Sequence, residues 1–376
     1  MAAVAAIALA GCSSAAAVTT ASTAEGAVST SNAPRPATTT TSIPPATTSV
    51  PPTTVPPPAG NAQDPAAITD PGGNLPDPFV LKVPGGYELY ASQTGLYAQS
   101  IPTAFSKTFG RWPATHAALI VTPPWATDGF DWAPDVRHLD GEYVMYFDSL
   151  AQPSLYYNGE GTGFSQYAQC IGVATSKAPG GPFVGRAAPL ICDFAAHGAI
   201  DARTFLAPSG QLYLDWKSDD NAASPAPYLA THLYAQQLSP NGLSLKGPAH
   251  LLLSADARWQ ENIVEAPDMV VARGTFWLFY SGSWFNGSSY GVGYATCAGP
   301  IGPCADRTTS GPFLGSNSQG EGPGEESLFE DTNGDWWILY SPWFFGWQGT
   351  SNRPLAIAPI AFKASPYLAA PVTATG

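Results

Sequence analysis

Charge is the first thing that this sequence has little of. Only 11% of its 376 residues are charged, and 15 Lys and Arg residues stand against 28 Asp and Glu residues. Nucleic acids and anionic membrane surfaces are recognised by clustered basic side chains. An acidic chain with so few basic residues offers no such surface, and we expect no nucleic acid among its partners.

Long apolar segments, helical periodicity and metal motifs are missing too. A membrane-spanning helix needs about 20 consecutive apolar residues, and no segment of this chain provides them. No long stretch repeats its apolar residues with the period of a helix. The five histidines and five cysteines do not have the spacing of a zinc site. These absences argue against a helical membrane domain, a helical fold and a zinc centre.

Aromatic residues, glycine and proline are abundant instead. The chain has 11 Trp, 16 Tyr, 38 Gly and 38 Pro residues. Together with the low charge, this composition favours an extracellular, β-rich protein with a neutral, sugar-like ligand. Many secreted β-sandwiches share the composition, so it leaves the architecture open.

The N-terminus is a short apolar run that ends in Leu9-Ala-Gly-Cys12. This run resembles the lipobox of bacterial lipoproteins, in which the cysteine is acylated and becomes the mature N-terminus. We therefore expect residues 1–11 to be a lipoprotein signal peptide and Cys12 to carry the lipid, with an ordinary cleaved signal peptide as the alternative. The protein would then lie outside the cytoplasm, anchored to the bacterial cell membrane only by this lipid, or be secreted.

Residues 12–65 consist mainly of Ala, Thr, Ser and Pro. Such a segment cannot bury a core and is expected to form a disordered, partly polyproline tether. The globular domain then covers residues 66–376. Its four cysteines pair by locality as Cys170–Cys192 and Cys297–Cys304, because an even number outside the cytoplasm favours disulfides.

A strand rich in Tyr and Trp recurs five times in the globular part, at intervals of roughly 55 to 70 residues. The copies are residues 87–92, 143–149, 212–218, 276–281 and 336–341. Most of them follow a turn that contains glycine. Repeated β units of this size are typical of a propeller in which each repeat forms one four-stranded blade. We therefore predict an all-β fold, a five-bladed β-propeller.

An acidic residue stands upstream of each aromatic strand, at the start of another strand. These residues are Asp77, Asp135, Asp201, Glu265, and Glu325 or Glu326. Because the first strand of each propeller blade lines the central channel, we expect the acids to converge on one funnel. Neighbouring carboxylates raise some pKa values and leave others ionised, which suits general acid–base chemistry. For any one of them, a turn cap or a structural cation site is the alternative.

Several motifs resemble those of glycoside hydrolase family 43. They are Asp77-Pro-Phe-Val80, Trp132-Ala-Pro-Asp-Val136, residues 171–183, Ile200-Asp201 and Val264-Glu-Ala-Pro267. They occur in the family's order and spacing, and the resemblance covers residues 70–363. The family contains arabinanases, α-L-arabinofuranosidases and β-xylosidases built on a five-bladed propeller.

The resemblance implies an inverting mechanism with three acids. Asp77 would be the base that activates water, Asp201 would tune the acid, and Glu265 would donate a proton to the leaving oxygen. In inverting enzymes the base and the acid stand roughly 6.5–9.5 Å apart. Glu265 must be protonated at the working pH, and we expect an apolar strand mouth and the nearby Asp201 to raise its pKa.

Three further residues are expected to contact or support the substrate. Trp132 would stack on a sugar face or else pack within its blade, and Arg353 lies where the family often has an arginine near the sugar. Asp135 would support the same site. The implied substrate is an arabinose- or xylose-containing glycan, bound by a monomer. The alternative is a propeller that binds carbohydrate and has lost catalysis.

The fifth blade departs from the family. Members commonly have Gly-Pro-Gly-His, with the histidine near an ion in the axial channel, whereas this chain has Gly322-Pro-Gly-Glu325. A glutamate offers an oxygen ligand that suits calcium. One expectation is therefore that Glu325 holds a calcium ion. The alternatives are that Glu325 pairs with a basic residue, or that the channel holds no metal.

Overall fold

The computed structural model describes residues 74–94, 98–109, 112–152, 168–222, 229–317, 320–343 and 353–368. The predicted signal peptide, Cys12 and the tether lie outside these residues. Within the described ranges, no helix is long and apolar enough to cross a membrane.

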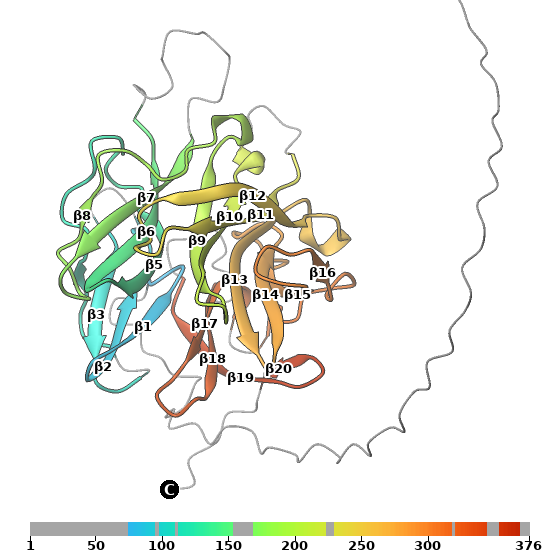
Figure 1. Cartoon of the computed structure of the whole chain (residues 1–376). Coiled ribbons are helices and arrows are strands. Elements are labelled where there is room, and N and C mark those ends of the chain that lie inside the picture. The colour runs from blue at the N-terminus through green and yellow to red at the C-terminus, as the bar shows by residue number, and fades with distance from the viewer. Residues whose placement is uncertain are drawn as a thin grey trace, which may run out of the picture. The chain divides into compact units, whose positions relative to one another are not determined.

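In these described residues, twenty strands form five antiparallel sheets of four, and strands that follow one another in the chain are neighbours in the sheet (Figure 1). The first sheet contains β1 (Phe79–Val83), β2 (Gly86–Tyr90), β3 (Pro102–Ser106) and β4 (His116–Ala117). The second contains β5 (Trp132–Leu139), β6 (Glu142–Leu150), β7 (Gln169–Ser176) and β8 (Val184–Gly185). The third contains β9 (Ala199–Leu206), β10 (Leu212–Ser218), β11 (His232–Leu238) and β12 (Leu245–Ser254).

The fourth sheet contains β13 (Val264–Ala272), β14 (Thr275–Gly282), β15 (Gly291–Cys297) and β16 (Cys304–Asp306). The fifth contains β17 (Glu321–Glu330), β18 (Trp336–Trp343), β19 (Ala356–Phe362) and β20 (Pro366–Leu368). Three short 3₁₀ helices lie in connections: η1 (Phe194–Ala196), η2 (Asp220–Ala222) and η3 (Arg258–Gln260).

The first strands of the sheets form a closed ring. Contacts run from β1 to β5, β9, β13 and β17 in turn, and from β17 back to β1. The last and first blades share one apolar cluster, in which Trp337 and Leu339 of β18 pack with Leu89 of β2. The prediction of a five-bladed β-propeller is confirmed.

All five aromatic segments become the second strand of a blade: β2, β6, β10, β14 and β18. Each is buried on both faces because it lies in the middle of its own sheet and between two neighbouring blades. Aromatic and β-branched side chains suit such positions. Both predicted disulfides are also present, Cys170–Cys192 and Cys297–Cys304.

Each blade has a non-glycine residue with a positive φ within its first strand or just before it. The residues are Asp77 (54°), Ala133 (46°), Asp201 (59°), Ala266 (49°) and Glu325 (53°). In the second to fifth blades, the register between the first and second strands shifts close to this residue. Such β-bulges turn a side chain out of the regular alternation of a strand.

Side chains from the preceding blade hold four of these bulges. Ser92 Oγ accepts the backbone N–H of Ala133 at 2.7 Å, and Asp148 Oδ2 accepts that of Asp201 at 2.8 Å. Asp201 Oδ2 accepts the N–H of Ala266 at 3.0 Å, and Ser281 Oγ accepts that of Glu325 at 2.9 Å. The strained backbone is therefore fixed by contacts between blades.

Candidate active site

A cavity of about 470 Å³ opens where the bulged ends of the first strands meet. Its walls combine carboxylates, two cations and several aromatic rings from all five blades. The residues used below are Asp77, Trp132, Asp201, Lys217, Asn221, Glu265, Phe285, Glu325, Trp343 and Arg353. Thus the four acids that the sequence assigned to catalysis or to a metal, Asp77, Asp201, Glu265 and Glu325, face one cavity.

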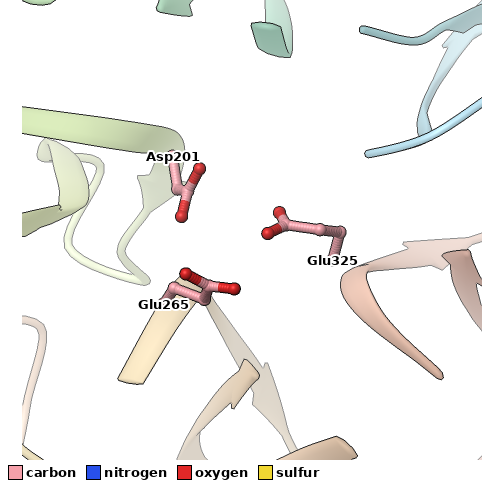
Figure 2. A group of neighbouring side chains, drawn as sticks. All are labelled: Asp201, Glu265 and Glu325. Carbon is pink, nitrogen blue, oxygen red and sulfur yellow. The ribbon is translucent and has the colours of Figure 1, made fainter. Parts of the chain in front are cut away.

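Three of these carboxylates point toward one another (Figure 2). Asp201, Glu265 and Glu325 come from β9, β13 and β17, and each offers an oxygen within 4.8 Å of the others. All three side chains are buried. This spacing could hold a metal ion, and it also suits carboxyl groups that share protons.

Asp77 is held differently. Arg353 Nη1 lies 3.1 Å from Asp77 Oδ1, and the hydroxyl of Ser92 donates to Asp77 Oδ2. Arg353 is itself buried, and its Nη2 donates to the carbonyl of Ser341 at 3.1 Å. Because both carboxylate oxygens have a donor, Asp77 is fixed in position and offers lone pairs to a further proton donor.

Glu265 is surrounded by polar groups. Its Oε2 lies 3.1 Å from Lys217 Nζ, and its Oε1 accepts the hydroxyl of Tyr290 at 2.6 Å. The prediction that an apolar strand mouth surrounds Glu265 is therefore wrong. The apolar neighbours in sequence, Val264 and Ala266, do not determine what the carboxylate meets, because the bulge at Ala266 turns it toward other blades.

Lys217 is a fully buried cation at the end of β10, and sequence reasoning missed it. Burial lowers its pKa, but the carboxylates of Glu265, Asp219 and Asp201 outweigh burial and raise the pKa above the usual range. Lys217 also lies 3.3 Å from Asp219 Oδ1. It therefore supplies permanent positive charge to a cavity that is otherwise crowded with acids.

Asp201 also interacts with a further buried carboxyl group, that of Asp148. Burial and then the charge of Glu265 raise the pKa of Asp201 to about 7, against the influence of Lys217. Asp148, on β6, accepts the backbone N–H of Asp201. Burial and the neighbouring Asp201 raise the pKa of Asp148 well above its usual range. Asp148 was not predicted, although a carboxylate inside the apolar segment 143–149 was a visible signal.

Asp135 does not line the cavity and lies two residues beyond the bulge of its blade. Its Oδ2 accepts a hydrogen bond from the hydroxyl of Thr204 at 2.6 Å. Burial raises the pKa of Asp135, and the charges of Arg203 and Arg137 oppose this rise. The expectation of five acids in register therefore fails in the second blade. The segment Trp132-Ala-Pro-Asp135 matches Glu265-Ala-Pro-Asp268, so Trp132 occupies the position of Glu265 and Asp135 that of Asp268.

Aromatic rings frame the acids. Trp132 is half-buried in the cavity wall, beside Phe130 at 6.1 Å between ring centroids. Phe285, which is 48% exposed, lies next to Trp343, and the guanidinium of Arg353 sits 5.6 Å from the Trp343 ring centroid. Flat apolar surfaces beside polar groups are what the two faces of a sugar ring require.

Known proteins resemble this chain in sequence and in fold. The family model of Glycosyl hydrolases family 43 matches residues 71–365. None of the curated proteins matches the chain significantly. Among solved structures, a thermostable family-43 glycoside hydrolase is 22% identical, with a TM-score of 0.68 over 81% of this chain and 95% of that chain.

Two further structures share the fold. An endo-arabinase from Bacteroides thetaiotaomicron is 19% identical, with a TM-score of 0.61 over 78% of this chain and 96% of that one. A β-xylosidase/α-arabinofuranosidase from a compost microbial metagenome, solved with xylotriose in a calcium-free form, is 20% identical, with a TM-score of 0.60 over 83% and 98%. The match of the family model over most of the chain shows that this protein belongs to glycoside hydrolase family 43.

Proposed function

We propose that the protein is an inverting glycosidase that cleaves arabinofuranosyl or xylosyl linkages in a polysaccharide or oligosaccharide. The observation that carries the proposal is the contrast between two carboxylates in one cavity. Both oxygens of Asp77 are held by Arg353 and Ser92, whereas Glu265, which contacts Lys217 through one oxygen, also lies among carboxyl groups and a tyrosine hydroxyl with which it can exchange protons. Inversion needs one base and one acid with opposite tasks.

In this mechanism Asp77 accepts a proton from the attacking water while Glu265 protonates the departing glycosidic oxygen. Arg353 and Ser92 keep the Asp77 carboxylate aimed at the water. Asp201 holds the N–H of Ala266 and so fixes the bulge that presents Glu265. After product release, Asp77 returns its proton to solvent and Glu265 is protonated again, so protons balance over one turnover.

The sugar would pack against the aromatic walls, and its hydroxyl groups would form hydrogen bonds with polar atoms of the cavity. Within the described residues, Asn221 Oδ1 and Arg353 Nε are buried without a hydrogen-bond partner. A neutral pentose hydroxyl can satisfy both types of group, one as donor and one as acceptor. The related structures titled as an endo-arabinase and as a β-xylosidase/α-arabinofuranosidase with xylotriose support pentose glycans as the substrate class.

Calcium between the three carboxylates fits this site poorly. Oxygen ligands suit calcium in type, but Glu265 is already paired with Lys217, and the Tyr290 hydroxyl contacts both Glu265 and Glu325. A cation bound directly to Glu265 would also keep it deprotonated and unable to act as the acid. The proposed mechanism therefore includes no step at a metal ion.

The test is hydrolysis by purified Asp77→Asn and Glu265→Gln variants, with Glu330→Gln as a matched control. Glu330 is exposed at the far end of β17. Substrates would be aryl arabinofuranosides and xylosides with good and poor leaving groups, beside polymeric arabinan and xylan. On substrates with poor leaving groups, loss of either group should slow cleavage by about 10²–10⁴-fold.

The two variants should differ in their dependence on the leaving group. Glu265→Gln should keep most activity on dinitrophenyl glycosides, which need no acid, whereas Asp77→Asn should lose activity on all substrates. The first-formed anomer, followed by NMR, should have the inverted configuration. Full activity in either variant would refute the proposal, and glycan binding without any product from the wild type would favour a silent carbohydrate-binding propeller.

We also propose that the domain is carried outside the cytoplasm on a lipid attached to Cys12. The support is the Leu9-Ala-Gly-Cys12 sequence followed by a tether rich in Pro, Thr, Ser and Ala. Expression in a bacterium fed labelled palmitate should give a labelled membrane protein that becomes unlabelled in Cys12→Ala. A wild-type protein that takes up no label would contradict the anchor.

A further inference from the structure

Tyr290 joins the proposed acid to the unexpected glutamate of the fifth blade. Its hydroxyl lies 2.6 Å from Glu265 Oε1 and 2.9 Å from Glu325 Oε1. The residue precedes β15 and is completely buried. Gly324 makes this position available, because a Cβ at Gly324 would overlap the Tyr290 ring.

One hydroxyl has one hydrogen, so Tyr290 can donate to only one of the two carboxyl groups. If both glutamates were ionised, the other carboxylate would face a lone pair of the phenol oxygen in a buried place. That arrangement brings a lone pair of the phenol oxygen against a lone pair of a carboxylate oxygen, 2.6 Å away for Glu265 or 2.9 Å away for Glu325, which is unfavourable in a buried place. The contacts are satisfied when one glutamate is protonated and donates to Tyr290 Oη while Tyr290 donates to the other.

The surrounding charges decide which glutamate holds the proton. Lys217 contacts Glu265, and its positive charge stabilises the negative charge of the Glu265 carboxylate. Glu325 instead faces Asp201, Asp77 and Glu265, and the positive charge of Arg353 opposes them. Burial and these acids raise the pKa of Glu325 well above its usual range. Burial and the same two glutamates raise the pKa of Tyr290, so its hydroxyl stays protonated.

We propose that Glu325, Tyr290 and Glu265 form a proton relay in which Glu325 stores the proton that Glu265 delivers to the leaving group. The step moves two hydrogens in the same direction. The Glu325 proton passes to Tyr290 Oη while the Tyr290 proton passes to Glu265 Oε1. The result is neutral Glu265, ready to donate, and ionised Glu325, which now accepts from Tyr290.

The relay rests on the proposed function. After each turnover, Glu325 regains its proton from solvent. Glu325 lines the cavity, so water can return its proton once the product has left. Other titratable or charged groups face the three residues from neighbouring elements: Asp77 before β1, Asp201 on β9, Lys217 and Asp219 at the end of β10, and Arg353 before β19. Glu325 and Tyr290 are thus positioning residues that act through Glu265.

A first test follows the pH dependence of kcat/KM in Glu325→Gln. The alkaline limb reports loss of the proton that Glu265 must carry. Without the Glu325 store, the relay should hold this proton less tightly, so the limb should move about one pH unit or more toward acid. The loss of rate should be about tenfold or greater for poor leaving groups and small for dinitrophenyl glycosides. An unchanged limb, or equal losses on both substrates, would overturn the relay.

A double-mutant cycle separates a relay from simple charge repulsion. In the Tyr290→Phe background the connection is already broken, so adding Glu325→Gln should cause little further loss of rate. A charge acting through space would instead give the same factor in both backgrounds, and that result would overturn the proposal. Glu330→Gln is the control for removing a carboxylate from the same strand and should match the wild type.

Two further readouts do not require an active variant. The infrared difference spectrum, wild type minus Glu325→Gln at neutral pH, should contain a buried carboxylic-acid band, and the absence of that band would overturn the proposal. Calcium or EDTA should leave the pH profile unchanged, whereas activation by calcium that depends on Glu325 would also overturn it. A wild type that hydrolyses no glycoside would refute the proposed function, while the infrared result would still decide where the proton resides.

Discussion

Asp201 makes the stability of this protein depend on pH in a direction opposite to that of most carboxylates. In the folded protein its pKa is raised from 3.8 to about 7, because it is buried and faces Glu265. Between these two values the unfolded chain releases the proton while the folded protein keeps it. Stability therefore falls as pH rises from about 4 to about 7, at up to about 1.4 kcal/mol per pH unit.

The shift of about three units corresponds to about 4 kcal/mol of differential stability. Coupling to Asp148 and Glu265 spreads part of this over the neighbouring carboxyl groups, so we expect Asp201→Asn to recover about 2–4 kcal/mol between pH 4 and pH 8. The asparagine oxygen can still accept the N–H of Ala266. The variant should thus become more stable relative to the wild type as pH rises.

Urea unfolding followed by tryptophan fluorescence at several pH values measures this difference. The free energy of unfolding of the wild type should fall more steeply with pH than that of Asp201→Asn. Asp140→Asn, in an exposed turn where asparagine suits the positive φ, is the control and should run parallel to the wild type. Parallel curves for Asp201→Asn and the wild type would refute the reasoning.

Two other substitutions test the geometry around the acids. Arg353→Lys should reduce activity and destabilise the fold by about 1–3 kcal/mol, because one ammonium cannot contact both Asp77 and the carbonyl of Ser341 on β18. Kinetics and a urea midpoint equal to those of the wild type would contradict this prediction. Gly324→Ala should destabilise the protein by about 1–3 kcal/mol and lower kcat by displacing Tyr290, because an added Cβ overlaps the ring. The control is Gly311→Ala, because a Cβ at Gly311 meets no atom within 4 Å. Equal urea midpoints for the two variants would contradict the proposed overlap with Tyr290.

The fold could be predicted because its signals are local and repeated. Each second strand combines an apolar aromatic segment with a preceding turn, so five of them were visible without knowing any contact. The closure of the ring follows from their number and similar spacing. The site was partly visible for the same reason, since Asp77, Asp201, Glu265 and Glu325 stand at equivalent ends of inner strands and do meet.

What could not be predicted depends on bulges and on contacts between blades. A bulge shifts which side chain faces the channel by one residue, and no residue type marks it, as Ala133 and Ala266 show. The environment of Glu265 was misjudged because its partners lie elsewhere in the chain, Lys217 on β10 and Tyr290 just before β15. Sequence neighbours say little about a side chain whose surroundings are built by long-range packing.

The acids of the cavity are gathered from blades that lie far apart along the chain. Asp77 precedes the first strand, Asp201 and Glu265 belong to the third and fourth blades, and Glu325 and Arg353 belong to the fifth. A chain emerging from a ribosome would therefore acquire its catalytic groups in sequence but bring them together only when the last blade docks on the first. During refolding, enzymatic activity should return after most of the sheet structure has formed, so that the time course of activity reports the final docking step.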